Sequence, residues 1–282
     1  MAAVSCGLGS IRAECLSGLV LNLHGDAITL SQRLWKRGVR DGHSLRHEVL
    51  RSREPLIFGV VHHYSSHSFL LRNWLRAHRI DPDRDVRIVV VPPPQVAANL
   101  KAGHLDGYCV GEPYNSLAVL ARTGWCVAIS PDLAPGHPEK VLMVRKEFAE
   151  RSERGHLGLI AALAEACRFC DRPENRERIT ETLAQPQYVD VAIRALQMSF
   201  GGAFDFGNGR IEKVPNFHVF ARDNANEPTL AKARWVFDNL HSSGLLADPA
   251  EVPAEDIGKW FRADIYARAL RESPLPKTSV LR

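Results

Sequence analysis

Short apolar runs separated by turn residues dominate the first half of the chain. The runs at 56–61, 86–91 and 105–110 are too short for helices and are bounded by residues that break regular structure, as buried strands are. A further apolar segment, 20–29, is interrupted around Gly25 by polar residues and predicts a strand that bends. This part of the chain therefore predicts several buried strands.

The segment 86–115 is the most informative part of the pattern. Its order is strand, proline break, short helix at 95–101, glycine turn, strand, and then the turn Gly111-Glu112-Pro113. A strand-helix-strand crossover builds parallel sheet, and ligands of open parallel sheets bind at the carboxyl ends of the strands. Because the turn lies at such an end, the pattern predicts a cleft that binds a small molecule.

Helical periodicity dominates the second half of the chain. Short strands are predicted at 125–129 and 140–144, and glycines at 201–209 predict a turn-rich loop. The segments with helical spacing are 155–170, 174–183, 229–246 and 252–271. Strands with helices between them, followed by helices, make this an α/β chain.

Composition places the chain among ordinary globular proteins. Of its 282 residues 45% are hydrophobic and 24% charged, and the net charge of +4 favours an anionic ligand weakly and nucleic acid not at all. Six unevenly spaced cysteines do not resemble a disulfide framework. Without an apolar stretch of about 20 residues or a signal-like start, we expect no membrane insertion. As written the chain would be cytoplasmic, or periplasmic if its natural start is missing.

The segment 62–68 offers a candidate anion site where a strand gives way to a helix. Ser65, Ser66 and His67 can supply donors beside the free N–H groups of the helix start. Alternatively, a serine only caps the helix and the histidines are solvated. A metal site is not expected, because His62 and His63 would point to opposite faces of a strand and no cysteine or carboxylate cluster completes a shell.

Neither a redox motif nor an enzyme motif is convincing. Cys167 and Cys170 lie three apart in a predicted helix, where they are neighbours on one face and favour packing. Glu112 has the chemistry of a general base, yet no nucleophile motif, phosphate loop or dinucleotide fingerprint accompanies it. We therefore expect no enzyme and no cofactor.

Six segments in order resemble a known family. They read LNLHGDAIT (21–29), DPD (81–83), VPPP (91–94), DGYCVGEPYN (106–115), HPEK (137–140) and CDRPENR (170–176). This order is similar to that of the nitrate- and bicarbonate-binding proteins of bacterial ABC importers. It is also similar to that of the related cytoplasmic nitrate/nitrite sensor NasS, which partners an RNA-binding antiterminator.

The resemblance implies a two-lobed periplasmic-binding-protein type 2-like fold. Lobe one would comprise 1–54 and 121–282 and be incomplete at its start, while lobe two would comprise 55–120. The implied function is non-catalytic binding of nitrate, nitrite or bicarbonate in an inter-lobe cleft. The implied partner is an ABC transporter permease or an antiterminator regulator, without direct contact to nucleic acid.

On this interpretation the binding residues form three groups. Backbone N–H groups and histidines donate hydrogen bonds to the anion, while Asp26 and Glu112 orient these donors. The groups are His24, Gly25 and Asp26; Ser65, Ser66 and His67; and Glu112. The alternative is a ligand-independent interaction protein, or a degenerate one that has lost high-affinity binding.

Overall fold

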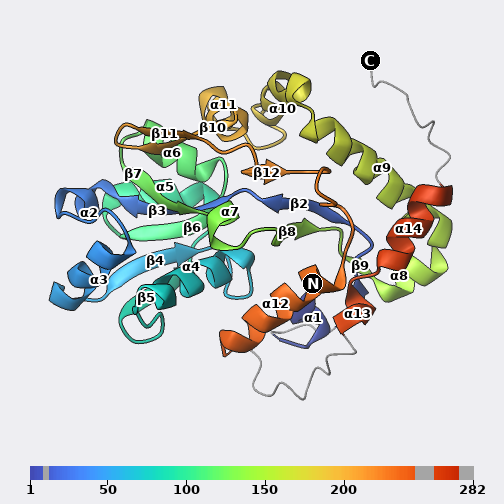
Figure 1. Cartoon of the computed structure of the whole chain (residues 1–282), viewed down its shortest axis with the longest axis horizontal. Coiled ribbons are helices and arrows are strands. Elements are labelled where there is room, and N and C mark those ends of the chain that lie inside the picture. Colours follow the sequence, from blue (N-terminus) through green and yellow to red (C-terminus); the bar gives the residue numbers. More distant parts are fainter. Residues whose placement is uncertain (9–12, 245–256, 273–282) are drawn as a thin grey trace. The chain divides into compact units, whose positions relative to one another are not determined.

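The chain passes back and forth between two groups of elements in the computed structural model, which describes residues 1–8, 13–244 and 257–272 (Figure 1). Unit 1 comprises Met1–Leu23, Gly136–Pro173 and Val219–Arg282, and unit 2 comprises His24–Pro135 and Glu174–His218. This grouping assigns 24–54, 121–135 and 174–218 to unit 2, unlike the boundaries expected from the resemblance. The lobe boundaries themselves remain a prediction.

Unit 2 is built on a five-stranded mixed sheet with the order β5-β4-β6-β3-β7. Its strands are β3 (Asp26–Ser31), β4 (Leu56–Val60), β5 (Val86–Val90), β6 (Gly107–Gly111) and β7 (Gly124–Ile129). Strand β4 is parallel to both β5 and β6, whereas β3 is antiparallel to both β6 and β7. The crossover from β5 to β6 therefore builds parallel sheet, as the sequence predicts, with β4 between the two strands.

Helices pack around this sheet, and a hairpin adds to its core. The helices are α2 (Gln32–Lys36), α3 (Gly42–Arg51), α4 (Ser66–Ala77), α5 (Pro93–Ala102), α6 (Tyr114–Leu120), α7 (Ser130–Leu133), α10 (Arg176–Leu183) and α11 (Ile193–Phe200). The hairpin is β10 (Ala203–Gly207) with β11 (Arg210–Lys213), so the predicted turn-rich loop at 201–209 is wrong in part. Asn208, with φ of 54°, and its flanking glycines form the hairpin's turn.

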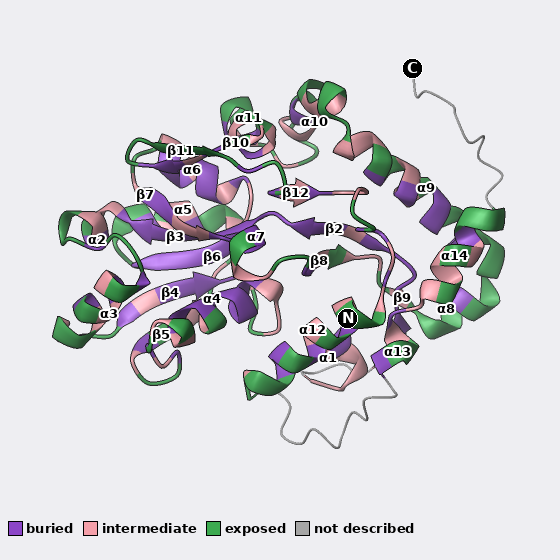
Figure 2. Ribbon diagram, viewed as in Figure 1, coloured by how far each residue is buried: buried purple, intermediate pink, exposed green. Residues whose placement is uncertain are grey.

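Local sequence explains where two of these helices begin and end. Ser65 caps α4 by accepting a hydrogen bond from the N–H of Ser68, and Phe69, Leu70 and Trp74 of this helix are buried. Helix α5 begins with proline and ends at Gly103, whose φ of 81° suits glycine. Figure 2 shows the buried strands inside this shell, and every residue of β3 is buried.

Unit 1 contains a three-stranded sheet, β12-β2-β8, and a two-stranded antiparallel one, β1-β9. The strands are β1 (Cys15–Leu16), β2 (Val20–His24), β8 (Pro138–Val141), β9 (Val144–Arg145) and β12 (His218–Val219). The helices are α1 (Ala2–Ser5), α8 (Lys146–Arg151), α9 (Glu153–Asp171), α12 (Leu230–Ser242), α13 (Ile257–Trp260) and α14 (Ala263–Glu272). A short 3₁₀ turn, η1 (Pro173–Asn175), follows α9.

Unit 1 differs from the sequence expectation in detail. The single strand predicted at 140–144 is two short strands, and the helix predicted at 252–271 is α13 plus α14, with 252–256 outside the described residues. A Cβ at Gly18 would lie 2.6 Å from Cδ1 of Ile160 in α9, so a side chain there would require the Ile160 side chain to shift. Cys167 and Cys170 both lie on α9, as predicted, and Cys167 is buried.

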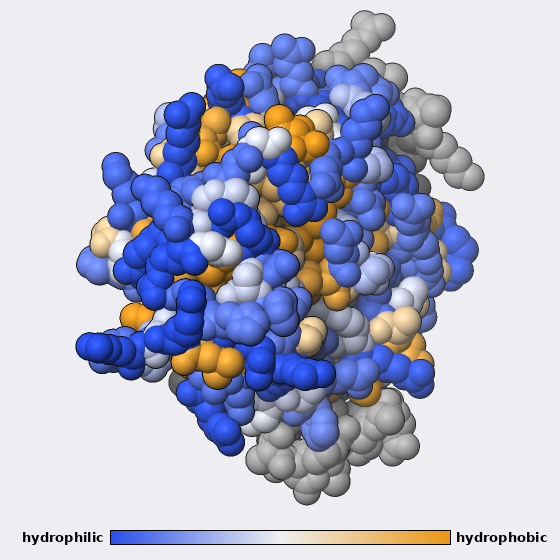
Figure 3. Space-filling view, turned by 60° about the vertical axis from the view of Figure 1, so that its left-hand side comes forward, coloured by the Kyte–Doolittle hydropathy of each residue, from blue (hydrophilic) through white to orange (hydrophobic). Residues whose placement is uncertain are grey.

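Charged and polar side chains predominate on the face shown in Figure 3, with apolar ones scattered between them. Two large apolar side chains of unit 2, Leu50 and Ile211, are 64% and 63% exposed. Single exposed apolar residues of this kind are normal on globular proteins and do not define a binding surface.

Candidate functional site

Four segments of unit 2 meet at one edge of its sheet. The carboxyl ends of the parallel strands β4 and β6 lie at this edge, and α4 begins a few residues after β4. Because β3 is antiparallel to β6, Asp26 at the start of β3 lies opposite Gly111 at the end of β6. The end of β7 reaches the same edge, where Ala27 pairs with Ile129.

Asp26 and His67 form the centre of this edge. Nε2 of His67 lies 3.0 Å from Oδ1 of Asp26, and the Asp26 side chain is fully buried. The backbone N–H of Asp26 donates to Oγ of Ser130, 3.1 Å away, at the start of α7. Asp26 is thus held at its backbone by Ser130, and its carboxylate orients the imidazole at the start of α4.

Gly111 at the end of β6 lies close to the Asp26–His67 pair. A Cβ at this position would lie 3.5 Å from Oδ1 of Asp26 and 3.7 Å from Nε2 of His67. These are ordinary van der Waals distances, so a side chain would cover the pair without moving it. The glycine therefore lets the backbone at the end of β6 lie close to the two polar groups, which are themselves buried.

The bend predicted within 20–29 lies at His24 and Gly25. Their φ values of 61° and 101° are left-handed, and they separate β2 from β3. The carbonyl of Gly25 accepts a hydrogen bond of 2.9 Å from the N–H of Glu112, which ties the start of β3 to the end of β6. The buried His24 ring lies with Nδ1 2.9 Å from the carbonyl of Asn216, so Nδ1 carries the hydrogen and donates.

The serines at the start of α4 divide into two kinds. Ser65 is the helix cap, because its hydroxyl donates to the carbonyl of His62 at 2.7 Å and accepts from the N–H of Ser68. Ser66 is the first helical residue. The hydroxyl of Ser68 is fully buried and has no hydrogen-bond partner among the described residues. A buried hydroxyl of this kind favours an additional small ligand or water.

Glu112 is oriented toward α6 and carries an unusual pKa. Its Oε2 accepts a hydrogen bond of 3.2 Å from the N–H of Ser116, while Oε1 is buried without a partner in the described part of the chain. Desolvation raises the pKa of Glu112 to about 7, although hydrogen bonds from Ser116 and Asn115 oppose the shift. Glu112 therefore holds the first turn of α6 and titrates near neutral pH.

The predicted residues thus share one edge but not one set of contacts. Asp26 and His67 touch each other, Gly25 and Glu112 are joined through their backbones, and Ser65 serves as a cap. Ser130 is not among the residues predicted from the sequence, although a Ser-Pro pair directly after the predicted strand 125–129 is a usable signal. The role of Gly111 beside the pair was also missed, because it depends on the pairing of β3 with β6.

This edge has the chemistry of an anion site. Helix α4 has twelve residues, and its N-terminus carries a partial positive charge on free N–H groups. When His67 is protonated, the Asp26 carboxylate compensates its charge and holds it in place. Hydroxyl, imidazole and backbone donors can together surround a small anion.

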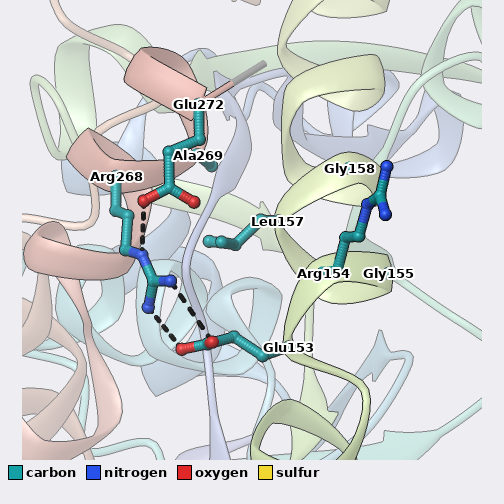
Figure 4. Close-up of a pocket in the computed structure, with 8 residues that line it drawn as sticks. All are labelled: Glu153, Arg154, Gly155, Leu157, Gly158, Arg268, Ala269 and Glu272. Atoms are coloured by element: carbon teal, nitrogen blue, oxygen red, sulfur yellow. Dashed lines mark hydrogen bonds and ion pairs between the residues drawn. The ribbon is translucent and has the colours of Figure 1, made fainter. Parts of the chain in front are cut away.

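A pocket of about 710 Å³ in unit 1, between α9 and α14, has a different character (Figure 4). A solvent-exposed ion-pair network joins Arg268 to both Glu153 and Glu272, and Leu157 lies between the helices. Because two carboxylates already bind the Arg268 guanidinium, this charge is not available to an anion. Among the described residues, no helix combines the length and apolarity needed to cross a membrane.

Comparison with known proteins identifies the group to which this architecture is similar. A family model described as the NMT1-like family matches residues 1–184. The nitrate import ATP-binding protein NrtC of Synechocystis sp. (strain ATCC 27184 / PCC 6803 / Kazusa) is 35% identical over 277 residues, which are 97% of this chain and 41% of that protein. The nitrate/nitrite binding protein NrtA of Nostoc sp. (strain PCC 7120 / SAG 25.82 / UTEX 2576) is 31% identical over 259 residues, 89% of this chain and 58% of NrtA. The chain therefore spans only part of each relative.

A solved structure extends the comparison to the fold. The periplasmic nitrate-binding protein NrtA from Synechocystis PCC 6803 superposes with a TM-score of 0.89 at 24% identity, covering 98% of this chain and 72% of NrtA. This likeness confirms the predicted α/β fold of the periplasmic-binding-protein type.

Proposed function

Because the chain belongs to the NMT1-like family, we propose that it binds a small inorganic oxyanion, nitrate or nitrite in the first place, without transforming it. The observation that carries the proposal is the buried Asp26–His67 pair at the N-terminus of α4, which the backbone of Gly111 approaches closely. The choice of nitrate or nitrite as the anion is supported by the relatives whose names refer to nitrate.

In this proposal the donors surround the anion and the carboxylates stay behind them. His67, the hydroxyls of Ser66 and Ser68, and the first N–H groups of α4 face the anion. Asp26 orients His67 and compensates its charge, so the anion meets a neutral pair plus the positive end of the helix. Gly25 and Glu112 hold the backbone of β3 against β6.

We further propose that the chain works with an ABC transporter, as the name of the relative NrtC indicates for that protein. An importer component would act in the periplasm, whereas a sensor that partners an antiterminator would act in the cytoplasm. Cell fractionation and co-purification with and without nitrate distinguish the two. A partner that co-purifies with the chain only in the presence of nitrate, or only in its absence, favours the sensor. A transporter subunit found in the same cell fraction as the chain favours the importer.

Calorimetric titration tests the site directly. The wild-type chain is titrated with nitrate, nitrite and bicarbonate, with chloride as a simple anion for comparison. His67→Ala removes a charge-assisted donor and should weaken nitrate binding about tenfold or more, since such hydrogen bonds contribute roughly 1.5–3 kcal/mol. His104→Ala removes an exposed histidine outside this edge and should leave affinity unchanged.

Far-UV circular dichroism of each variant establishes that it is folded. If the folded wild-type protein gives no heat with any oxyanion, the proposed function is wrong. If His67→Ala binds nitrate as tightly as wild type does, the function stands but the site has been misplaced.

A further inference from the structure

Helix α3 carries two histidines that lie outside the proposed anion site. His43 and His47 are one turn apart, at positions i and i+4, and both side chains are exposed. Their Nε2 atoms are 3.1 Å apart, and their ring planes are nearly perpendicular at 83°. Residues at this spacing lie on the same face of a helix, so both rings project from one side of α3.

We propose that His43 and His47 chelate a divalent late first-row transition-metal ion, such as Ni²⁺ or Zn²⁺, on the surface of α3. The donor set is two imidazole nitrogens, which such ions prefer and which Mg²⁺ and Ca²⁺ do not. Water completes the coordination shell, because no third histidine, cysteine or carboxylate ligand atom joins the pair among the described residues.

The nitrogen separation fits a shared metal ion. With metal–nitrogen distances of about 2.1 Å, a nitrogen separation of 3.1 Å corresponds to an angle at the metal of about 95°. Angles of this size occur between adjacent ligands in octahedral and square-planar shells, and a small opening of the pair gives the tetrahedral angle. The rings need no large movement to bind a metal.

The two rings are joined by a hydrogen bond between their Nε2 atoms, but they do not meet end to end. If an Nε2–H pointed straight at the other ring's lone pair, the ring centroids would be about 5.4 Å apart, whereas convergence on one metal ion gives about 4.8 Å. The observed centroid distance is 4.7 Å. The ring separation is thus the one expected of two imidazoles that share a metal ion, and the ion would replace the Nε2–Nε2 hydrogen bond that joins the rings here.

Two charged neighbours of this pair on and before α3 are engaged in other protein contacts. Arg46 lies between the histidines in sequence, yet its Nε donates to the backbone carbonyl of Arg79 at 3.3 Å. Asp41 caps the helix, with its carboxylate accepting from the N–H and the hydroxyl of Ser44. Both groups are thus fixed by protein contacts, and α3 is well formed before any metal binds.

The test is calorimetric titration of the full chain with NiCl₂ at pH 7.5 in a non-coordinating buffer. Wild type is compared with the single variants His43→Gln and His47→Gln, and circular dichroism verifies that each is folded. Because the second imidazole binds a metal already held by the first, loss of either one should weaken the site about tenfold or more. Both single variants should lose affinity to a similar extent.

The double variant His62→Gln/His63→Gln is the matched control. It also removes two neighbouring exposed histidines, but their ring centroids are 6.5 Å apart. Its Ni²⁺ affinity should equal that of wild type, which excludes a general effect of histidine content. Equal affinity in wild type and both single variants, or no Ni²⁺ binding by the folded wild type, would overturn the proposal.

Discussion

Glu112→Gln should make the protein's stability less dependent on pH. The glutamate side chain faces α6, its Oε1 is buried without a partner among the described residues, and burial raises its pKa from 4.5 to about 7. Glutamine keeps the shape and still offers an oxygen to the N–H of Ser116, but it carries no charge at any pH. The substitution therefore isolates the cost of ionising this carboxyl group inside the fold.

The size of the effect follows from linkage. A folded-state pKa above the unfolded value means that the folded state binds more protons between the two values, so stability falls as pH rises through this range. A difference from 4.5 to about 7 corresponds to roughly 3.4 kcal/mol in total. About 2.5 kcal/mol of this loss falls between pH 5 and pH 8, and no further loss occurs well above pH 7.

Urea denaturation at pH 5, 6, 7 and 8 measures the effect. The difference in unfolding free energy, glutamine variant minus wild type, should increase by about 2.5 kcal/mol from pH 5 to pH 8. Glu54→Gln, at an exposed glutamate, provides the control and should run parallel to wild type. Parallel curves for Glu112→Gln and wild type would refute the argument that Glu112 is ionised at a cost.

Two further predictions concern single contacts. Gly25→Ala places a side chain on a residue with a φ of 101° and should lower the free energy of unfolding by about 1–2 kcal/mol in denaturation experiments. Gly158→Ala is the control: this residue lies in a helix with open space around it, so the substitution should be neutral or stabilising. Asp171→Ala leaves the backbone N–H groups of residues 220–222 and the Arg222 guanidinium without their common acceptor, and should cost about 3 kcal/mol. A loss below about 1 kcal/mol for Asp171→Ala would show that water replaces the carboxylate at no cost.

The sequence predicts the strands of unit 2 well because each is a short apolar run between strong breakers. The runs at 56–61 and 86–91 correspond to β4 and β5, and the Ser65 cap marks the start of α4 as expected. The hairpin at 203–213 was missed because its glycines were interpreted as loop signals, although glycine and asparagine also form tight hairpin turns.

The composition of the site could be predicted only in part, since it depends on pairing between distant segments. The helix start at 65–67 and the turn at Glu112 are local signals, whereas the contact of Asp26 with His67 requires β3 to lie beside β6. Nothing in the periodicity of 20–29 states whether that strand runs parallel or antiparallel to its neighbours. Ser130 depends on the same fact, because β7 pairs with β3.

The direction of β3 is what makes this edge a candidate site. In a wholly parallel sheet, only strand ends and the loops after them would gather here. An antiparallel β3 instead brings its first residue, Asp26, to the carboxyl ends of β4 and β6, where the positive end of α4 lies. A buried carboxylate at this place would repel an anion if it stood alone, but its contact with His67 turns it into support for a donor. The same strand direction brings Gly25 against Glu112, so one feature of topology positions the histidine, its carboxylate and the backbone behind them.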